Sequence, residues 1–447
     1  MRLWIKRPLA ILADKAQGGV VVEGAVIAER VPRGGSPKQP VDAVFDAGDH
    51  VVLPGLINTH HHFYQTLTRA HPPALNKRLF PWLDALFHTW QHLDAGMLRV
   101  AVRLAIAELV LSGCTTVADH HYLFNDALAE AVDIEVEEVR RLGVRAVITR
   151  GAMNLPKEVA GFAPPSLVQD EDTVLAQSEA ALSAYHERGA GAMVQIALAP
   201  CSPFSVSEAL MADTALLARR HGARLHTHLA ETRDEIAYCQ DTFGCRTVDY
   251  LERLGWLAAD VWLAHGIHFD RDEIARLGTA GVGVAHCPSS NQVLASGFCP
   301  VPELERAGVA VGLGVDGSAS NDHSNLMQEV RQAFLAQRAT HDAPAVTHWD
   351  ALRWATAGSA ACLGRDDLGV IAEGRRADLA LFKLDELRFS GAGDALAALV
   401  LCGAYRADRV MVGGRWVVVD GALPSEDLDA LMHEHGAAAR RLRACAG

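Results

Sequence analysis

A chain of 447 residues, half of them hydrophobic, can form one large core plus a smaller domain, which indicates a globular protein. A formal net charge of -13, a pI near 5.9 and no Lys/Arg-rich run argue against nucleic acid or an anionic membrane as partner, and favour a small molecule. Nine cysteines without a C-x-x-C pair fit a reducing compartment better than a disulfide framework.

The first residues, "MRLWIKRPLAILADKAQGG", contain an apolar run that Asp14 and Lys15 interrupt before it reaches signal-peptide length. No segment approaches 18 consecutive apolar residues, so no membrane span is predicted. We therefore expect a cytoplasmic protein.

Both ends of the chain are rich in short Val/Ile/Leu runs separated by glycine turns, which predict strands. These runs are "GGVVVEGAVIAERV" near the start, and "GRRADLALFKL" and "RADRVMVGGRWVVVDGAL" near the end. We expect residues 1–55 and 366–423 to form one β domain together. Residues 424–447 predict a C-terminal helix that packs on the rest.

Residues 56–365 are expected to alternate strands with amphipathic helices. The strand candidates, the first of which begins in the preceding region, are "VVLPGLIN", "TTVADHH", "VRAVITRG", "MVQIALAP", "ARLHTHLAE", "VWLAHG", "VGVAHCP" and "VAVGLGVDG". The stretch "SEALMADTALLARRHG" predicts a helix that ends at its glycine. Eight such alternations over roughly 300 residues favour a (β/α)8 TIM barrel, with a doubly wound open sheet as the alternative.

Polar residues recur at the carboxyl ends of these strands, where barrel enzymes place their chemistry. They are His60 and His62, Asp119 and His121, His226 and His228, His265, His286, and Asp316. A single histidine at such a place is usually structural. Convergence of several at one barrel mouth favours a functional site.

Alternation of side chains along a strand sorts the three consecutive histidines. His60 and His62 point to one face and His61 to the other, and a pair at i and i+2 suits a metal ion. In "RLHTHLAET", His226 and His228 also share a face. His228 is nearer the mouth and is the better ligand, whereas His226 is expected a layer deeper; spacing alone leaves this choice open.

Several motifs in a fixed order carry a family resemblance. "PGLINTHHH", "HTHLAET", "AHGIH", "VAHCPSSN", "GLGVDGSASND" and "ATAGSAACLG" with "GVIAEGRRADLALF" resemble the amidohydrolase superfamily, in its cytosine deaminase-like and triazine hydrolase-like branch. The resemblance covers nearly the whole chain. It implies a (β/α)8 barrel with a composite β-sandwich from both termini, and a homo-oligomer.

Position by position, the resemblance implies that His60, His62, His228 and Asp316 bind a metal ion, and that His61 does not. It also implies that Glu231, His265 and Asp316 are catalytic around a water held by that ion. Three imidazoles and one carboxylate leave room for water, whose pKa a divalent ion lowers from about 15.7 to about 7. Asp316 would take the proton of this water, and His265 would orient it.

Glu231 would protonate a ring nitrogen of the substrate, although a carboxylate in "ETRDE" can also stabilise a helix N-terminus. Binuclear relatives bridge two ions with a lysine after strand four. Here only Lys77 and Lys157 occur between residues 56 and 365, and neither follows strand four. We therefore expect one divalent metal ion, Zn²⁺, with Fe²⁺ or Mn²⁺ as alternatives.

The loop after strand one, "FYQTLTRAHPPALNKRLFPWLDALFHTW", is expected to contact substrate. The Gln65 amide can pair with a carbonyl beside a ring N–H, or merely order the loop. Trp90, like Trp82, would wall the pocket or pack in the core. Cys201, after strand four, is a further substrate-binding candidate, although free cysteines are usually just buried.

Within the branch, this loop and "APCSPFSVS" resemble the group that deaminates 8-oxoguanine. That resemblance implies hydrolytic deamination of an aminated purine base, from 8-oxoguanine to urate and ammonia. The alternatives are a guanine- or isocytosine-type deaminase, an S-adenosylhomocysteine-type deaminase and a triazine hydrolase. A non-catalytic scaffold is disfavoured because every ligand position is filled. The sequence assigns no role to His61, His121, His226, His268 or His286.

Overall fold

The computed structural model describes residues 1–158 and 163–446, and its centre is an eight-stranded parallel sheet whose strand order follows the chain. The strands are β7 (Leu56–Ile57), β8 (Cys114–Asp119), β9 (Arg145–Ala152), β10 (Val194–Pro200), β11 (Leu225–Leu229), β12 (Val261–His265), β13 (Gly283–His286) and β14 (Ala310–Leu313). A parallel bridge between Asn58 and Leu313 closes the sheet between its first and last strands. The predicted (β/α)8 barrel is therefore confirmed, and an open doubly wound sheet is wrong.

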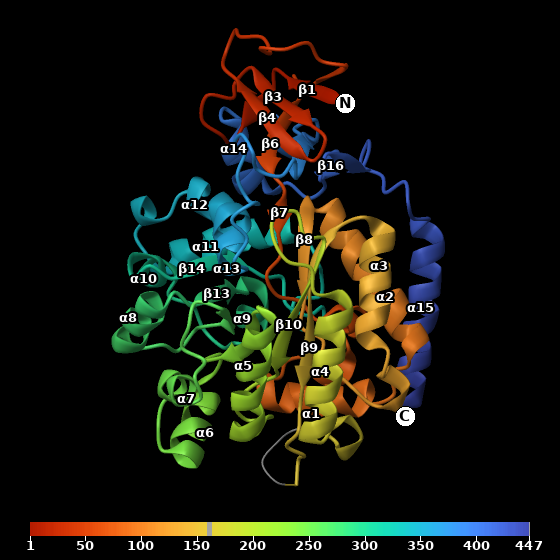
Figure 1. Ribbon diagram of the computed structural model, residues 1–447, viewed down its shortest axis with the longest axis vertical. Coiled ribbons are helices and arrows are strands. Elements are labelled where there is room, and N and C mark those ends of the chain that lie inside the picture. The colour runs from red at the N-terminus through yellow and green to blue at the C-terminus, as the bar shows by residue number, and fades with distance from the viewer. Residues whose placement is uncertain (159–162, 447) are drawn as a thin grey trace.

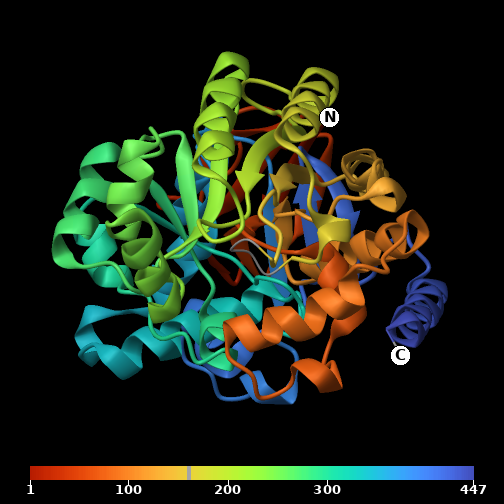
Figure 2. The same cartoon turned by 90° about the horizontal axis from the view of Figure 1, so that it is seen from below.

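Helices surround this barrel, as the end-on view in Figure 2 shows. They are α1 (Leu79–Trp90), α2 (Ala95–Leu111), α3 (Ala131–Leu142), α4 (Glu171–Tyr185), α5 (Glu208–His221), α6 (Arg233–Phe243), α7 (Thr247–Arg253), α8 (Arg271–Ala280), α9 (Pro288–Val293), α10 (Val301–Arg306), α11 (Leu326–Thr340), α12 (His348–Arg353) and α13 (Ser359–Cys362).

Local sequence sets the ends of these helices. Ser207 caps α5 by accepting a hydrogen bond from the Leu210 N–H, and Gly222 ends the helix in a left-handed conformation with φ 63°. The predicted glycine cap of this helix is therefore confirmed. α8 begins with a capping box in which Asp270 and Glu273 each accept a hydrogen bond from the other's backbone N–H.

Two further sheets form a smaller domain at one end of the barrel (Figure 1). One has the order β4 (Val26–Val31), β3 (Gly19–Glu23), β1 (Arg2–Lys6), β5 (Ala43–Asp46), and the other the order β17 (Arg415–Val418), β16 (Arg409–Val412), β15 (Leu379–Lys383), β6 (His50–Pro54), β2 (Ala10–Ile11). The second sheet joins strands from both ends of the chain, as predicted. Leu3 and Val20 of the first sheet share a hydrophobic core with Leu379 and Met411 of the second.

The run "VVLPGLIN" differs from the single strand expected from sequence. It divides at Gly55: β6 pairs with β15 in the small domain, whereas β7 pairs with β8 in the barrel. A Cβ at residue 55 would lie 2.1 Å from the Thr115 hydroxyl oxygen, so only glycine allows the chain to cross here. The residue limits of the domains stay a prediction.

Helix α15 (Leu428–Cys445) packs along α2 on the side of the barrel (Figure 1), and the short α14 (Ala395–Ala398) lies next to α12. Within the described residues, no helix is both long enough and apolar enough to span a bilayer. All nine cysteines are free thiols.

The barrel interior contains an apolar layer at the small-domain end. Its side chains come from successive strands, and the bulky Trp262 of β12 stands among smaller neighbours: Ile57, Ala118, Val147, Ala197 and Ala285. Ala360 of α13 and Leu363, the residue after that helix, pack against this layer. The polar residues considered next gather at the opposite end, where the strands end.

Candidate active site

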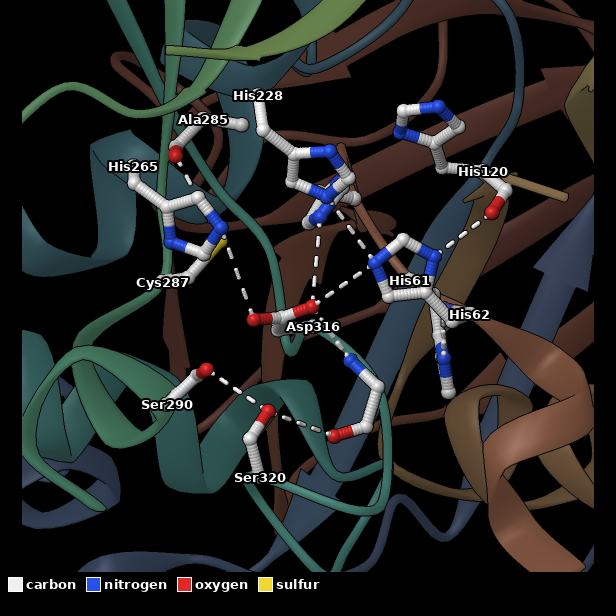
Figure 3. A network of polar contacts seen from close by, with 12 residues as sticks. His61, His62, His120, His228, His265, Ala285, Cys287, Ser290, Asp316 and Ser320 are labelled. Atoms are coloured by element: carbon white, nitrogen blue, oxygen red, sulfur yellow. Dashed lines mark hydrogen bonds and ion pairs between the residues drawn. The ribbon is translucent and has the colours of Figure 1, made fainter. Parts of the chain in front are cut away.

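Three histidines and one aspartate meet at the carboxyl ends of the barrel strands. His60 and His62 follow β7, His228 lies on β11, and Asp316 lies three residues beyond β14. Asp316 Oδ1 lies 3.3 Å from Nε2 of both His60 and His62, and Nε2 of His228 lies 3.2 Å from Nε2 of His62. Figure 3 shows the Asp316 carboxylate facing the imidazoles of His62 and His228. The four predicted ligand residues are thus brought together.

The tautomers of these imidazoles follow from their outer hydrogen bonds. A backbone carbonyl only accepts, so Nδ1 of His62 donates to the His120 carbonyl at 2.7 Å, and Nδ1 of His228 donates to the Cys201 carbonyl at 2.7 Å. Each ring therefore presents an unprotonated Nε2 to the centre of the group. Burial lowers the pKa of His62 to about 3 and holds the pKa of His228 well below its ordinary value, which keeps both rings neutral.

These features fit a divalent cation. Neutral imidazole nitrogens and a carboxylate oxygen are typical zinc ligands, and tetrahedral geometry needs ligand atoms a little over 3 Å apart. Nε2 of His60 is buried and has no hydrogen-bond partner among the described residues. A buried nitrogen lone pair facing a carboxylate is unfavourable without a proton or a cation between them.

Two of the site residues have strained backbone conformations. Asp316 has φ 62° and His265 has φ 74°, left-handed conformations that residues with a Cβ rarely adopt. The Asp316 N–H donates to the His60 carbonyl at 3.0 Å, which links the segments after β14 and β7. Residues in such conformations concentrate at functional sites, because the surrounding structure must maintain them.

Glu231 and His265 lie on the other side of Asp316. His265 Nε2 is 3.6 Å from Glu231 Oε2 and 3.9 Å from Asp316 Oδ2. Burial raises the pKa of Glu231 to about 7, so this carboxyl can hold a proton at neutral pH. Burial alone would lower the pKa of His265, but the charges of Glu231 and Asp316 outweigh it and raise that pKa.

Two residues that sequence inspection did not single out hold this pair. Asn291 accepts a hydrogen bond from Nδ1 of His265 at 2.8 Å through its side-chain oxygen. The Glu235 carboxylate accepts from the N–H groups of Ala230 and Glu231, at 2.8 and 2.9 Å. Asn291 lies in "VAHCPSSN" and Glu235 in "ETRDE", so each belongs to a segment quoted above, but the sequence does not indicate its partner.

A cavity opens onto these groups. Its apolar wall contains Leu79, Trp82, Leu83, Phe87, Phe204 and Leu294, and its polar wall contains Gln65, Tyr122, Cys201, Ser202, Ser205 and Ser320. Asp316, Glu231 and His265 also line this cavity, so the polar groups of the site face a space whose lining is largely apolar. Such a space suits a flat, uncharged ring better than a charged chain.

Of the three predicted substrate contacts, Gln65 and Cys201 line the cavity and Trp90 does not. Gln65 lines the cavity, and its side-chain oxygen accepts from the Ala319 N–H at 3.3 Å. A Cβ at residue 317 would lie 1.9 Å from that oxygen, so Gly317 is required for this approach. Cys201 also lines the cavity, with its sulfur 3.8 Å from Nδ1 of His228.

Trp90 was a candidate for substrate contact, but it is not among the residues that line the cavity. It is completely buried, packs edge-on against Trp82 and Tyr64, and donates to the Thr68 hydroxyl. Trp82 forms the cavity wall instead. The sequence left both tryptophans as either pocket wall or core, and did not indicate which of them reaches the cavity.

The unassigned histidines have separate partners. His61 turns away from His60 and His62, and its Nε2 lies 2.8 Å from the Ser324 hydroxyl, as alternation predicted. His121 donates to the Leu123 carbonyl, His268 to the Ser296 carbonyl, and Nε2 of His286 lies 3.5 Å from the Gln337 amide nitrogen. His226 contacts His60 and is considered below.

The sequence model of the amidohydrolase family matches residues 51–417, which include every residue of this site. The chain belongs to the amidohydrolase family. Among its relatives, the 8-oxoguanine deaminase of Pseudomonas aeruginosa is 57% identical over 99% of both chains, and an isoxanthopterin deaminase from an unknown prokaryotic organism is 36% identical over 90% of this chain and 87% of that one.

Solved amidohydrolase structures have the same architecture. Atrazine chlorohydrolase from Arthrobacter aurescens TC1, in complex with zinc, superposes with a TM-score of 0.91 at 31% identity, over 98% of this chain and 100% of that one. The family resemblance inferred from the sequence motifs is therefore confirmed. This amidohydrolase is a hydrolytic enzyme with a His/Asp cluster suited to a metal ion.

Proposed function

We propose that this amidohydrolase hydrolyses the exocyclic amine of 8-oxoguanine and releases urate and ammonia. The observation that carries the proposal is the 57% identity, over 99% of both chains, to the 8-oxoguanine deaminase of Pseudomonas aeruginosa. The cavity supports it, since its lining offers Trp82 and Phe204 for packing against an uncharged bicyclic base and Gln65 for hydrogen bonding to it.

His60, His62, His228 and Asp316 are the residues that would hold one divalent ion, which we propose to be Zn²⁺. When bound, such an ion lowers the pKa of a water molecule to about 7 and makes hydroxide available at neutral pH. The zinc found with the Arthrobacter relative supports this choice of metal. With Pro200 and Cys201 at the end of β10, this chain has no lysine where a bridging ligand would be needed.

We assign the two proton transfers of the reaction to the carboxyl groups of Asp316 and Glu231. Asp316 accepts the proton of the attacking water and later returns it to the departing ammonia. Glu231, whose burial raises its pKa to about 7, donates to the ring nitrogen beside the reacting carbon. His265, held by Asn291, orients the attacking water between these carboxyl groups.

Gln65 is assigned to substrate recognition. Its amide can donate to a ring carbonyl and accept from the adjacent ring N–H, the edge that guanine-type rings share. Cys201, which lines the same cavity, would contact the ring by packing. We also infer a cytoplasmic location and a homo-oligomer.

The test compares kcat/KM for 8-oxoguanine, guanine, isocytosine, S-adenosylhomocysteine and a chlorotriazine on one metal-loaded preparation. An 8-oxo purine has an N7–H donor where guanine has an acceptor, and a mismatched buried polar group costs about 1–3 kcal/mol, or roughly 5- to 150-fold. We expect kcat/KM for 8-oxoguanine to exceed that for guanine by a factor within this range. Equal turnover of guanine contradicts the 8-oxo assignment, and turnover of the triazine alone contradicts deamination.

A further inference from the structure

We propose that His226 is a positioning residue that fixes the tautomer and orientation of the His60 imidazole, with Trp262 as its support. The inference rests on the proposed function, in which His60 holds a metal ion. His226 lies one layer below His228 on β11 and is itself completely surrounded by protein. It does not line the cavity, and its side-chain hydrogen bond toward the proposed ligands is to His60.

The direction of each hydrogen bond follows from one fixed acceptor. Nδ1 of His226 lies 2.8 Å from the Trp262 carbonyl oxygen, which can only accept, so this nitrogen carries the proton. Nε2 of the neutral His226 ring therefore has a lone pair. It lies 2.8 Å from Nδ1 of His60, which must donate. Nε2 of His60 is then unprotonated and available to a metal ion.

His60 differs in this respect from the other two imidazoles of the site. His62 and His228 each donate directly to a backbone carbonyl, which admits a single direction. The partner of His60 is another imidazole, which can donate as well as accept. Without the bond from His226 to the Trp262 carbonyl, His226 could donate to His60, and His60 would turn a protonated Nε2 toward the metal position.

Trp262 holds both ends of this connection. Its ring stacks on His226 with centroids 4.2 Å apart and planes inclined by 10°. Its indole N–H donates to the carbonyl of Thr59, the residue before His60, at 3.1 Å. One residue of β12 therefore restrains the His226 ring, accepts a hydrogen bond from its Nδ1–H and anchors the backbone beside His60.

The expected effect is on metal affinity. Groups that orient a metal ligand typically change affinity by about 10- to 100-fold when removed. His226→Phe keeps a flat ring beside Trp262 but cannot accept from His60. His226→Gln supplies an amide oxygen for His60 and an N–H group for the Trp262 carbonyl. His286→Phe is the matched control, since His286 is an equally buried histidine at the end of β13 without a hydrogen bond to the proposed ligands.

The experiment measures zinc affinity of the metal-free full-length variants by competition with a chromophoric chelator, after circular dichroism has shown that each is folded. Absorption spectra of the cobalt-substituted proteins report the ligand field separately from activity. We expect His226→Phe to bind zinc about 10- to 100-fold more weakly and to have an altered cobalt spectrum, while His226→Gln and His286→Phe remain within about fivefold of the wild type.

Other results overturn the inference. They are wild-type affinity in His226→Phe, an equal loss in His226→Gln, or an equal loss in His286→Phe. Should His226→Phe not fold, His226→Met tests the same contact: it removes the acceptor for Nδ1 of His60 with a flexible side chain of similar volume, and unchanged zinc affinity contradicts the inference. Failure of the wild-type protein to bind zinc, iron or manganese would instead contradict the proposed function.

Discussion

His62 and His228 are separated by 166 residues in the chain, yet their Nε2 atoms lie 3.2 Å apart. Both nitrogens are unprotonated, because each ring donates from Nδ1 to a carbonyl. Two lone pairs at this separation repel unless they share a cation. We therefore predict about one equivalent of divalent metal per chain, and loss of most of it in His228→Ala.

Metal analysis of the purified proteins checks this prediction. The exposed His88 on α1 provides a control, since His88→Ala should keep the wild-type metal content. Full metal content and activity in His228→Ala would mean that the ligand assignment is wrong. Two tightly held ions per chain would reject the mononuclear site.

Glu231→Gln should retain the fold and the metal but reduce kcat by about 10²–10⁴-fold, because an amide of the same size cannot transfer a proton to the ring. Steady-state kinetics with 8-oxoguanine, paired with metal analysis, measures both properties. Glu137→Gln, a change on the exposed face of α3, serves as the control. A loss of less than roughly tenfold for Glu231→Gln would count against its role as proton donor.

The two tryptophans of α1 should respond differently to substitution. Trp82 lines the cavity and donates to the Ala319 carbonyl, so Trp82→Phe should lower kcat/KM by about fivefold through loss of roughly 1 kcal/mol of hydrogen bonding. Trp90→Phe should lower the free energy of unfolding by about 1–3 kcal/mol and leave KM unchanged. Kinetics and denaturant unfolding of both variants make the comparison. A raised KM in Trp90→Phe alone would restore Trp90 as the substrate contact.

Asp367 should stabilise the protein in a pH-dependent way. Arg365 donates to both of its carboxylate oxygens, at 2.8 and 3.0 Å, and the Gly191 N–H donates at 2.7 Å. Burial alone would raise the pKa of Asp367, but these bonds lower it from 3.8 to about 2. Because the folded-state pKa is the lower one, the stabilisation of about 2 kcal/mol is complete above pH 4 and is lost as the pH falls toward 2.

Thermal unfolding of Asp367→Asn between pH 7 and pH 3 tests this dependence. The variant should unfold at a lower temperature than the wild type at pH 7, and the difference should shrink toward pH 3. Asp213→Asn, on the exposed surface of α5, should follow the wild type throughout. A difference that stays constant with pH would exclude ionisation of Asp367 as its cause.

Regular patterns in the sequence predicted the barrel and indicated side chains that gather at the ends of its strands. Each barrel strand from β8 to β14 overlaps a run predicted as a strand, and the His60/His62 alternation survives although both residues lie beyond the short β7. The division at Gly55 was missed because two strands of different sheets follow one another without a polar break. Sequence inspection also missed the acceptors of His62 and His228, since any residue has the backbone carbonyls that His120 and Cys201 provide.

The closure of the barrel has a consequence for how the enzyme unfolds. β7 and β14 share a single bridge, Asn58 with Leu313, extended by the Thr59 N–H to the Leu313 carbonyl. The proposed ligands lie on both sides of this seam, His60 and His62 after β7 and Asp316 after β14. A bound ion would therefore cross-link the segments that follow the first and last strands of the barrel. Chelation should accelerate hydrogen exchange at Thr59 and Asp316 first, so that loss of the ion loosens the contact between the first and last strands.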